Sequence, residues 1–117
     1  MTSIGTYIIE DHYKGDTFDG VQFTLKNITD NIPINLTGCA IKIQFRKSAP
    51  YGTLEKELTE VDGITIIDAI NGVFKINAFL LDWNKATYFY DVEVTFPNNV
   101  VKTYIKGTLS IIQDTTK

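Results

Sequence analysis

Apolar and polar residues alternate through most of this chain, and a period of two is the spacing of a β-strand whose two faces differ in burial. Val21, Phe23 and Leu25 share one face of a segment over residues 21–26, and polar side chains take the other face. Helical periodicity is nearly absent, and the Val, Ile, Thr and aromatic residues that favour strands are frequent. The alternation therefore predicts an all-β domain.

Turn signals recur roughly every ten residues and separate about eight alternating segments, a rhythm typical of an antiparallel β-sandwich. The expected strands cover residues 4–9, 21–26, 40–47, 54–58, 64–67, 73–78, 87–96 and 101–112. A chain of 117 residues with 44% hydrophobic residues suits one globular domain. We expect residues 1–117 to form a single sandwich, because no repeat or linker divides them.

The stretch YDVEVTFPNNVVKTYIKG, residues 90–107, reads as a hairpin. A tight turn at Asn98-Asn99, or a four-residue loop over 97–100, sets one register for both arms. The apolar face then pairs Val92 with Ile105, Val94 with Thr103 and Phe96 with Val101. The other face pairs Asp91 with Lys106, Thr95 with Lys102 and Glu93 with Tyr104, which places both lysines near carboxylates. Tyr90 lies opposite Gly107, whose missing side chain leaves space for the aromatic ring.

A second hairpin is expected around Asn71-Gly72, a dipeptide suited to the positive φ angles of a tight turn. Pairing directly across it places Asp68 opposite Lys75 but leaves the apolar Ile66 opposite Asn77. A wider loop over residues 68–72 avoids that mismatch, and we favour it.

The stretch NKATYFY is similar to the strand-F pattern of immunoglobulin domains, in which Asp-x-Ala precedes Tyr-x-Cys. Asn84 takes the place of the Asp and Tyr90 that of the Cys. Tyr88 is then the corner tyrosine, whose hydroxyl bonds to upstream backbone. This pattern makes the sandwich immunoglobulin-like, with packing in place of a disulfide between the sheets.

Charge, hydropathy and cysteine content exclude several classes of function. Eleven Lys and Arg against fourteen Asp and Glu give a net charge of −3, unlike a nucleic-acid-binding surface. No apolar run approaches the ~18 residues of a membrane span, and no signal peptide opens the chain, so we expect synthesis in the cytoplasm and no membrane partner. The single cysteine, Cys39, excludes an internal disulfide and is expected to be a core thiol.

No catalytic, cofactor or metal motif is present in the sequence. The one histidine, His12, has no nucleophile motif with it, and we expect it in a surface loop. The neighbouring acids do not have the spacing of an EF-hand, and their turn-forming role is the simpler reading; they are Glu10, Asp11, Asp16 and Asp19. Gly-rich phosphate loops are absent. We therefore expect no enzyme activity, no cofactor and no metal.

Carbohydrate binding is the alternative function, because aromatic rings on the surface of a sandwich can stack on sugar faces. Trp83, Phe89 and Tyr104 are the rings that such a module would use. The simpler expectation is that Trp83 closes the bottom of the sandwich and that Tyr104 covers lysine stems.

Over residues 14–113 the chain resembles small β-sandwich proteins and domains encoded among the structural genes of tailed bacteriophages, including the N-terminal domain of baseplate upper proteins. The resemblance is carried by the order of four segments: KGDTFDG, INLTGCAIKIQFRK, NGVFKI and YFYDVEVTFPNNVVKTYIKGTLSI. The present sequence differs from the baseplate proteins by ending after its last strand, so a free-standing sandwich is expected.

The resemblance implies a virion component without catalytic activity, present in host cytoplasm during assembly and then in the virion. Its role would be head decoration, fibre anchoring or a tail or baseplate accessory, and its partners would be capsid, fibre or tail proteins. It also implies self-association or many symmetric copies on a lattice.

Two segments are the expected contacts with such partners. Residues 1–13 form a candidate attachment arm or edge strand, because Ile4, Tyr7, Ile8 and Ile9 would offer apolar contacts there. The loop SAPYGT, residues 48–53, presents Tyr51 between turn-forming residues.

Overall fold

The computed structural model describes residues 5–27 and 29–113, and no helix occurs within them. The all-β class expected from the alternation is confirmed. The strands are β1 (Gly5–Thr6), β2 (Ile9–Tyr13), β3 (Thr17–Phe18), β4 (Val21–Thr24), β5 (Ala40–Lys47), β6 (Leu54–Thr59), β7 (Ile64–Asp68), β8 (Val73–Ile76), β9 (Phe79–Leu80), β10 (Ala86–Thr95) and β11 (Val101–Ile112).

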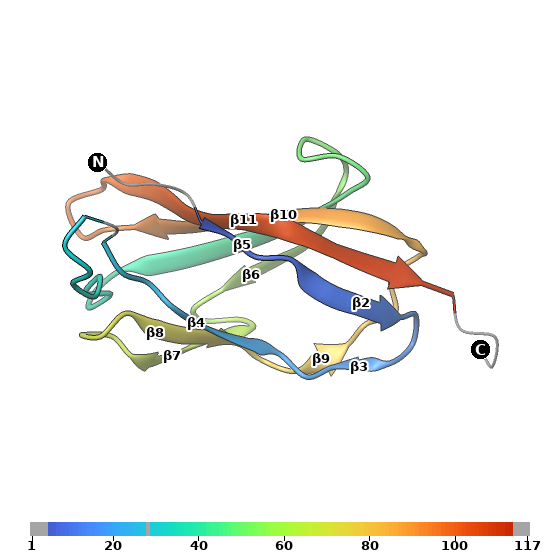
Figure 1. Cartoon of the computed structure of the whole chain (residues 1–117), viewed down its shortest axis with the longest axis horizontal. Coiled ribbons are helices and arrows are strands. Elements are labelled where there is room, and N and C mark those ends of the chain that lie inside the picture. Colours follow the sequence, from blue (N-terminus) through green and yellow to red (C-terminus); the bar gives the residue numbers. More distant parts are fainter. Residues whose placement is uncertain (1–4, 28, 114–117) are drawn as a thin grey trace.

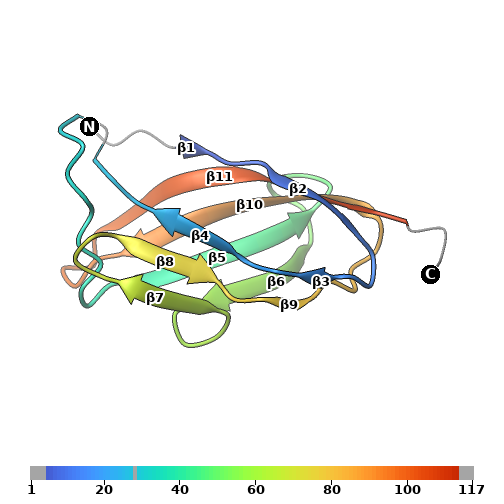
Figure 2. The same cartoon turned by 60° about the horizontal axis from the view of Figure 1, so that its bottom comes forward.

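These strands lie in two layers that face each other (Figure 1). One layer is a six-stranded sheet in the order β1-β11-β10-β5-β6, in which β2 also pairs with β11. The other layer holds the sheet β4-β8-β7, which the short pair β3-β9 continues (Figure 2). All neighbours are antiparallel except β1 and β2, which run parallel to β11.

Side chains from both layers form one apolar core. Ile41, Ile43 and Phe45 of β5 are at most 1% exposed, and Phe74 of β8 is fully buried. Within the described residues no polar or charged residue is buried. Because each Å² of apolar surface removed from water contributes about 25 cal/mol, this shared interior is the main force that holds the layers together.

Strand positions follow the expected ranges closely in the long strands and less closely near the N-terminus. β5 and β11 have the expected bounds of 40–47 and 101–112. The strand expected over 4–9 is instead β1 and β2, which continues to Tyr13, and the two-residue strands β3 and β9 were not expected. Eleven segments thus replace about eight, because such short strands leave too few residues for an alternation to be recognised.

The hairpin of β10 and β11 keeps the expected register as far as Val92, and the same register extends back to Ala86. Tyr90, Asp91 and Val92 pair with Gly107, Lys106 and Ile105, as expected. A bulge then shifts the pairing by one residue, and Glu93, Val94 and Thr95 lie opposite Thr103, Lys102 and Val101. The expected pairs of Glu93, Val94 and Thr95 are therefore wrong.

The shift begins in the turn. The N–H of Asn99 donates to the carbonyl of Phe96, the N–H of Phe96 donates to the carbonyl of Val100, and both distances are 2.8 Å. Asn99 has a φ of 69°. This is a type I turn followed by a left-handed residue, and Pro97 suits its second position. A three-residue loop of this kind changes the register by one, unlike either loop expected from the sequence.

The bulge turns two polar side chains toward the inner side of the hairpin. Tyr104 is the extra residue, and it and Ile105, although consecutive, are only 7% and 9% exposed. Lys102 lies directly opposite the buried Val94, and opposed residues project from the same face. The expected ion pairs of Lys102 and Lys106 do not form: in the described part of the chain the one ion pair joins Lys14 and Asp82 at 2.9 Å.

The hairpin of β7 and β8 has a loop wider than two residues, as favoured from the sequence. Asp68 pairs with Val73 after a bulge, and the N–H of Gly72 donates to the carbonyl of Ala69 at 3.1 Å. Gly72 has a φ of 71°, and a Cβ there would crowd the carbonyl oxygen of Leu25. A glycine is therefore required at this turn.

Tyr88 joins the start of β10 to the segment before it. Its side chain is fully buried, and its hydroxyl donates to the carbonyl of Asn84 at 2.6 Å. The bond fixes the entry of the chain into the central strand of the larger sheet.

Replacing Tyr88 with Phe removes this bond and keeps the ring. We expect the free energy of unfolding to fall by about 1 kcal/mol, because the Asn84 carbonyl loses its donor. Urea unfolding measures the change. Tyr13→Phe, at a residue that is 45% exposed, is the matched control and should leave the midpoint unchanged. An equal effect in both variants would contradict the structural role of this hydroxyl.

Candidate functional site

His12 lies in strand β2 and not in a surface loop, so that expectation was wrong. Its Nδ1 is 2.7 Å from the carbonyl oxygen of Glu10, which fixes the ring because Nδ1 must carry the proton that is donated. The ring also packs edge-on against Phe18, with centroids 5.2 Å apart. Its position is explained by these two contacts.

The acids near His12 do not assemble a metal site in the described part of the chain. Across residues 5–27 and 29–113, no three His, Cys, Asp or Glu side chains are grouped so that they could hold an ion. Lys14 contacts the side chain and the carbonyl of Asp82, at 2.9 and 3.1 Å. Of the four acids, Glu10 and Asp11 lie in β2, Asp16 lies in the turn after it, and Asp19 lies beyond β3.

The three aromatic residues considered for sugar stacking do not share a surface. Trp83 packs against Phe45, Phe79 and Tyr88, with ring centroids 5.0 to 5.9 Å apart, and it closes one end of the core. Tyr104 is only 7% exposed and lies inside the hairpin end of the sandwich. A stacking platform of Trp83, Phe89 and Tyr104 is therefore absent among the described residues.

The N-terminal segment is part of the larger sheet. β1 and β2 both pair with β11, and Ile9 is only 4% exposed, so its side chain belongs to the core. Ile8 is 70% exposed and Tyr7 is 43% exposed, which leaves these two side chains at the surface. Ile4 lies outside the described residues.

Tyr7, Tyr90 and Gly107 lock this segment in place. The Tyr90 hydroxyl donates to the carbonyl of Tyr7 at 2.6 Å, and the N–H of Tyr7 donates to the carbonyl of Lys106 at 2.9 Å. A Cβ on Gly107 would overlap the Tyr7 carbonyl oxygen and crowd the Tyr90 ring. The glycine thus admits a neighbouring backbone as well as the ring expected from the sequence. Burial raises the pKa of Tyr90, with a smaller contribution from Tyr7, so its hydroxyl stays protonated and can donate.

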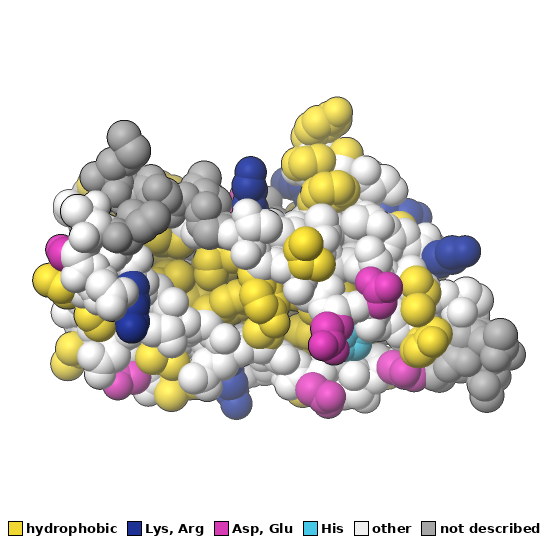
Figure 3. All heavy atoms as spheres, in the orientation of Figure 1, with side chains coloured by type: hydrophobic (Ala, Val, Ile, Leu, Met, Phe, Trp, Pro, Cys, Tyr) yellow, Lys and Arg dark blue, Asp and Glu magenta, His cyan; other side chains and the backbone are white. Residues whose placement is uncertain are grey.

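The loop between β5 and β6, residues 48–53, projects beyond the larger sheet (green in Figure 1) and carries hydrophobic side chains at its tip (Figure 3). Tyr51 is 89% exposed. Hydrogen bonds of 2.8 to 3.0 Å hold the loop, including one from Arg46 to the carbonyl of Gly52 and one from the N–H of Ser48 to the carbonyl of Thr87. Tyr51 is therefore an exposed ring on a fixed support.

A hollow of about 370 Å³ lies between this loop and the outer face of the larger sheet. Pro50 and Phe89 supply apolar surface, and Arg46, Asp91 and Lys106 supply charge. Burial raises the pKa of Asp91, Glu93 raises it further and the Arg46 guanidinium opposes the rise. The hollow thus lies beside the loop that carries Tyr51 and joins it to the outer face of the sheet.

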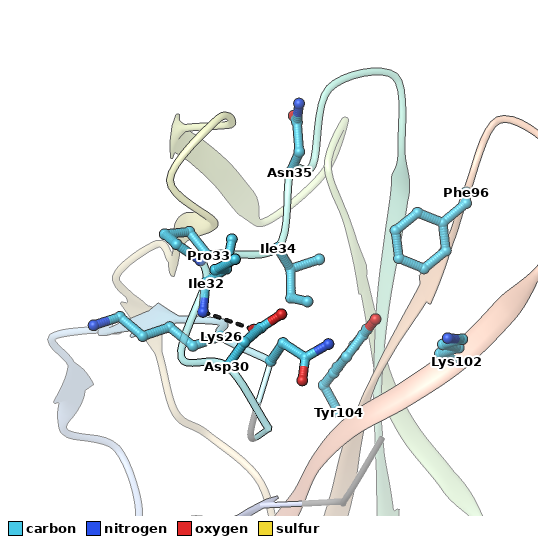
Figure 4. Close-up of a pocket in the computed structure, with 10 residues that line it drawn as sticks. Lys26, Asp30, Ile32, Pro33, Ile34, Asn35, Phe96, Lys102 and Tyr104 are labelled. Carbon is cyan, nitrogen blue, oxygen red and sulfur yellow. Dashed lines mark hydrogen bonds between the residues drawn. The ribbon is translucent and has the colours of Figure 1, made fainter. Parts of the chain in front are cut away.

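A second pocket, of about 390 Å³, lies between the hairpin end of β10 and β11 and the loop that follows β4 (Figure 4). Its lining residues are Lys26, Asn27, Asp30, Ile32, Pro33, Ile34, Asn35, Phe96, Lys102 and Tyr104. Sequence reasoning missed this pocket, because the expected register placed Lys102 and Tyr104 on the outer face. The three-residue turn chemistry of Pro97-Asn98-Asn99 is the signal that would have found it.

Short side-chain bonds shape the loop side of this pocket. Oδ1 atoms accept from the backbone N–H two residues later at Asn27, Asp30 and Asn35, at 2.9 to 3.0 Å. Such Asx turns leave the Nδ2 of Asn27 and the Oδ2 of Asp30 available to a ligand.

Cys39 lies near the pocket and is buried, as expected for a core thiol. Burial raises its pKa. Burial also raises the pKa of Tyr104, and the charge of a Cys39 thiolate would raise it further. Both groups are therefore protonated near neutral pH.

No protein-family model and no curated protein matches the sequence. In the described part of the chain, no helix has the length and hydropathy needed to cross a membrane.

Gly107→Ala should displace β1 and β2 from β11, because the new Cβ overlaps the Tyr7 carbonyl. We expect faster amide exchange over residues 5–13 and a clear loss of stability, measured by hydrogen exchange and urea unfolding. Thr108→Ala on the same strand is the control and should leave exchange over residues 5–13 unchanged. Equal exchange in Gly107→Ala and the parent would disprove the packing argument.

The Cys39 thiol should react at least about tenfold more slowly with a disulfide reagent in the folded chain than in urea at pH 8, because reaction needs an exposed thiolate. Its folded pKa is raised, so its contribution to stability is complete below the unfolded pKa of about 8.5 and is lost as pH rises through the folded value. Equal rates in the two states would show that Cys39 is accessible.

Proposed function

We propose that the two layers form an immunoglobulin-like sandwich. Two features support this assignment: one sheet carries β11, β10, β5 and β6 beside a parallel N-terminal strand, and the other carries β4, β8 and β7. The bond from Tyr88 to upstream backbone is of the tyrosine-corner type.

We further propose that the protein is a non-catalytic bacteriophage structural protein that acts by protein–protein attachment. It would serve as a head decoration protein, a fibre-anchoring adaptor or a tail or baseplate accessory, in the virion and, during assembly, in the host cytoplasm. The sequence resemblance supports the phage setting. The partners are other virion proteins and further copies of the chain on a lattice.

The observation that carries this proposal is the exposed ring of Tyr51 on its hydrogen-bonded loop. Tyrosine is enriched among the residues that dominate binding energy in protein interfaces. Because the loop is held by Arg46 and by backbone bonds, little conformational entropy is lost when the ring is buried by a partner. The hollow beside it, with Phe89 and Pro50, offers adjoining apolar surface.

Multiple copies would make a modest contact sufficient. When one subunit of a lattice is bound, its neighbours present their own loops at high effective concentration, so avidity exceeds the affinity of one Tyr51 contact. A rigid domain with fixed loops is suited to such repeated docking.

Mass spectrometry of purified virions of the encoding phage tests whether the chain is a virion component, and its absence from them would contradict the proposal.

Tyr51→Ala should reduce incorporation of the protein into virions at least about tenfold, as expected for a central interface residue that contributes more than ~1.4 kcal/mol to binding. The fold should be unaffected, because Tyr51 is 89% exposed. Val61→Ala, at another loop residue that is 89% exposed, is the control. Equal incorporation of the two variants would exclude Tyr51 as the anchor.

A further inference from the structure

The bulge in β11 places the polar side chains of Lys102 and Tyr104 in the pocket between the hairpin end and the loop after β4. Without the register shift, Lys102 and Tyr104 would lie on the outer face of the sheet. With it, both line the pocket, together with Phe96, which directly follows β10. Bulges often redirect side chains in this way beside binding sites.

Tyr104 is the residue that points to a ligand. It is only 7% exposed, and its hydroxyl has no hydrogen-bond partner among the described residues. Every fully buried side-chain oxygen or nitrogen in that part of the chain has a partner, so this hydroxyl must remain open to the pocket. Figure 4 shows it pointing between Ile34 and Phe96. A nearly buried hydroxyl of this kind has one free donor and free acceptor capacity.

The other polar groups complement it. The carboxylate of Asp30 turns toward the same space, whereas Lys26 and Asn35 point away from it (Figure 4). Oδ1 of Asp30 accepts from Ile32, which leaves Oδ2 as an acceptor, and Asn27 retains its Nδ2 donor. Lys102 adds a cationic donor without an ion pair in the described part of the chain.

We propose that this pocket binds a saccharide residue through a pair of neighbouring hydroxyls. Each sugar hydroxyl donates one hydrogen bond and accepts others, which matches an array of one carboxylate acceptor, two donors and the bifunctional hydroxyl of Tyr104. Ile34 and Phe96 supply apolar wall for the C–H face of the ring. The volume of about 390 Å³ lies in the range of small-ligand sites, which begins at about 300 Å³.

This site is separate from the attachment surface. The pocket adjoins the β10–β11 turn, whereas Tyr51 projects from the loop between β5 and β6 at a distance from that turn (Figure 1). It also does not use Trp83 or Phe89, so it is not the surface platform considered from the sequence. Sugar binding and incorporation into particles can therefore succeed or fail independently.

Titration of the full chain with methyl glycosides of glucose, galactose, mannose and N-acetylglucosamine, followed by amide NMR shifts, tests the proposal. At least one glycoside should shift the amides of Asp30, Lys102 and Tyr104 saturably in the millimolar range. Tyr104→Phe should weaken binding about fivefold and Asp30→Asn about tenfold, as expected for loss of a neutral and of a charged hydrogen bond. Asn at position 30 keeps the Oδ1 acceptor, so the loop turn is preserved.

Tyr13→Phe and Asp62→Asn are the matched controls, both at exposed residues outside the pocket, and they should bind as the parent does. Native amide spectra of all four variants exclude unfolding as the cause of any loss. The proposal is overturned if no glycoside shifts these amides, if the two pocket variants bind as tightly as the controls, or if the shifts lie around Phe89. Saturable shifts with free glycine and none with the glycosides would also overturn it.

Discussion

The pairing of β10 with β11 is the constraint on which the rest of the structure depends. β10 is hydrogen-bonded to β5 on one side and to β11 on the other, and β11 in turn carries β1 and β2. This ladder therefore sets which residues of β10 and β11 face inward, and β5 and the N-terminal strands align with these two strands. Its single bulge leaves the core alternation of Val92 and Val94 intact and moves the extra residue, Tyr104, to the inner side. The expected register at the centre of the sheet and the shifted register at the hairpin end coexist, because the bulge confines the shift to the pairs between it and the turn.

Much of the fold was predictable from the sequence because its main signal is local. A half-buried strand needs only alternating residues, so β5 and β11 could be bounded before any pairing was known. Gly107 lies opposite Tyr90, as counting back from the expected turn predicted, because the bulge cancels the one-residue shift that the actual turn introduces. Long-range backbone contacts had no such signal. Nothing near Gly107 in the sequence indicates that the carbonyl of Tyr7 lies against it, and a parallel pairing between the two ends of the chain has no turn to mark it.

The site was less predictable than the fold for a similar reason. One residue of register separates a surface tyrosine from one that lines a pocket, and the type of turn at Asn99 decides between them. The apolar character of Ile9 was recognised, but its face was assigned to a partner when it serves the core. The exposure of Tyr51 was simpler to predict, because a tyrosine between turn-forming residues lies in a loop and away from the core. Residues in loops were thus easier to place than residues near a bulge or an edge.

The parallel pairing of β1 and β2 with β11 also determines when the sheet can be completed. β1 and β2 precede every other described strand and β11 follows them all, so the N-terminal segment has no partner until β11 has been synthesised. During translation the hydroxyl of Tyr90 emerges long after Tyr7, and β11, which pairs with both early strands, emerges after the other described strands. The non-local contacts that close the domain make its folding slow relative to helical proteins of similar size. The first-made strands of the domain therefore dock only after the last of its described strands has been made.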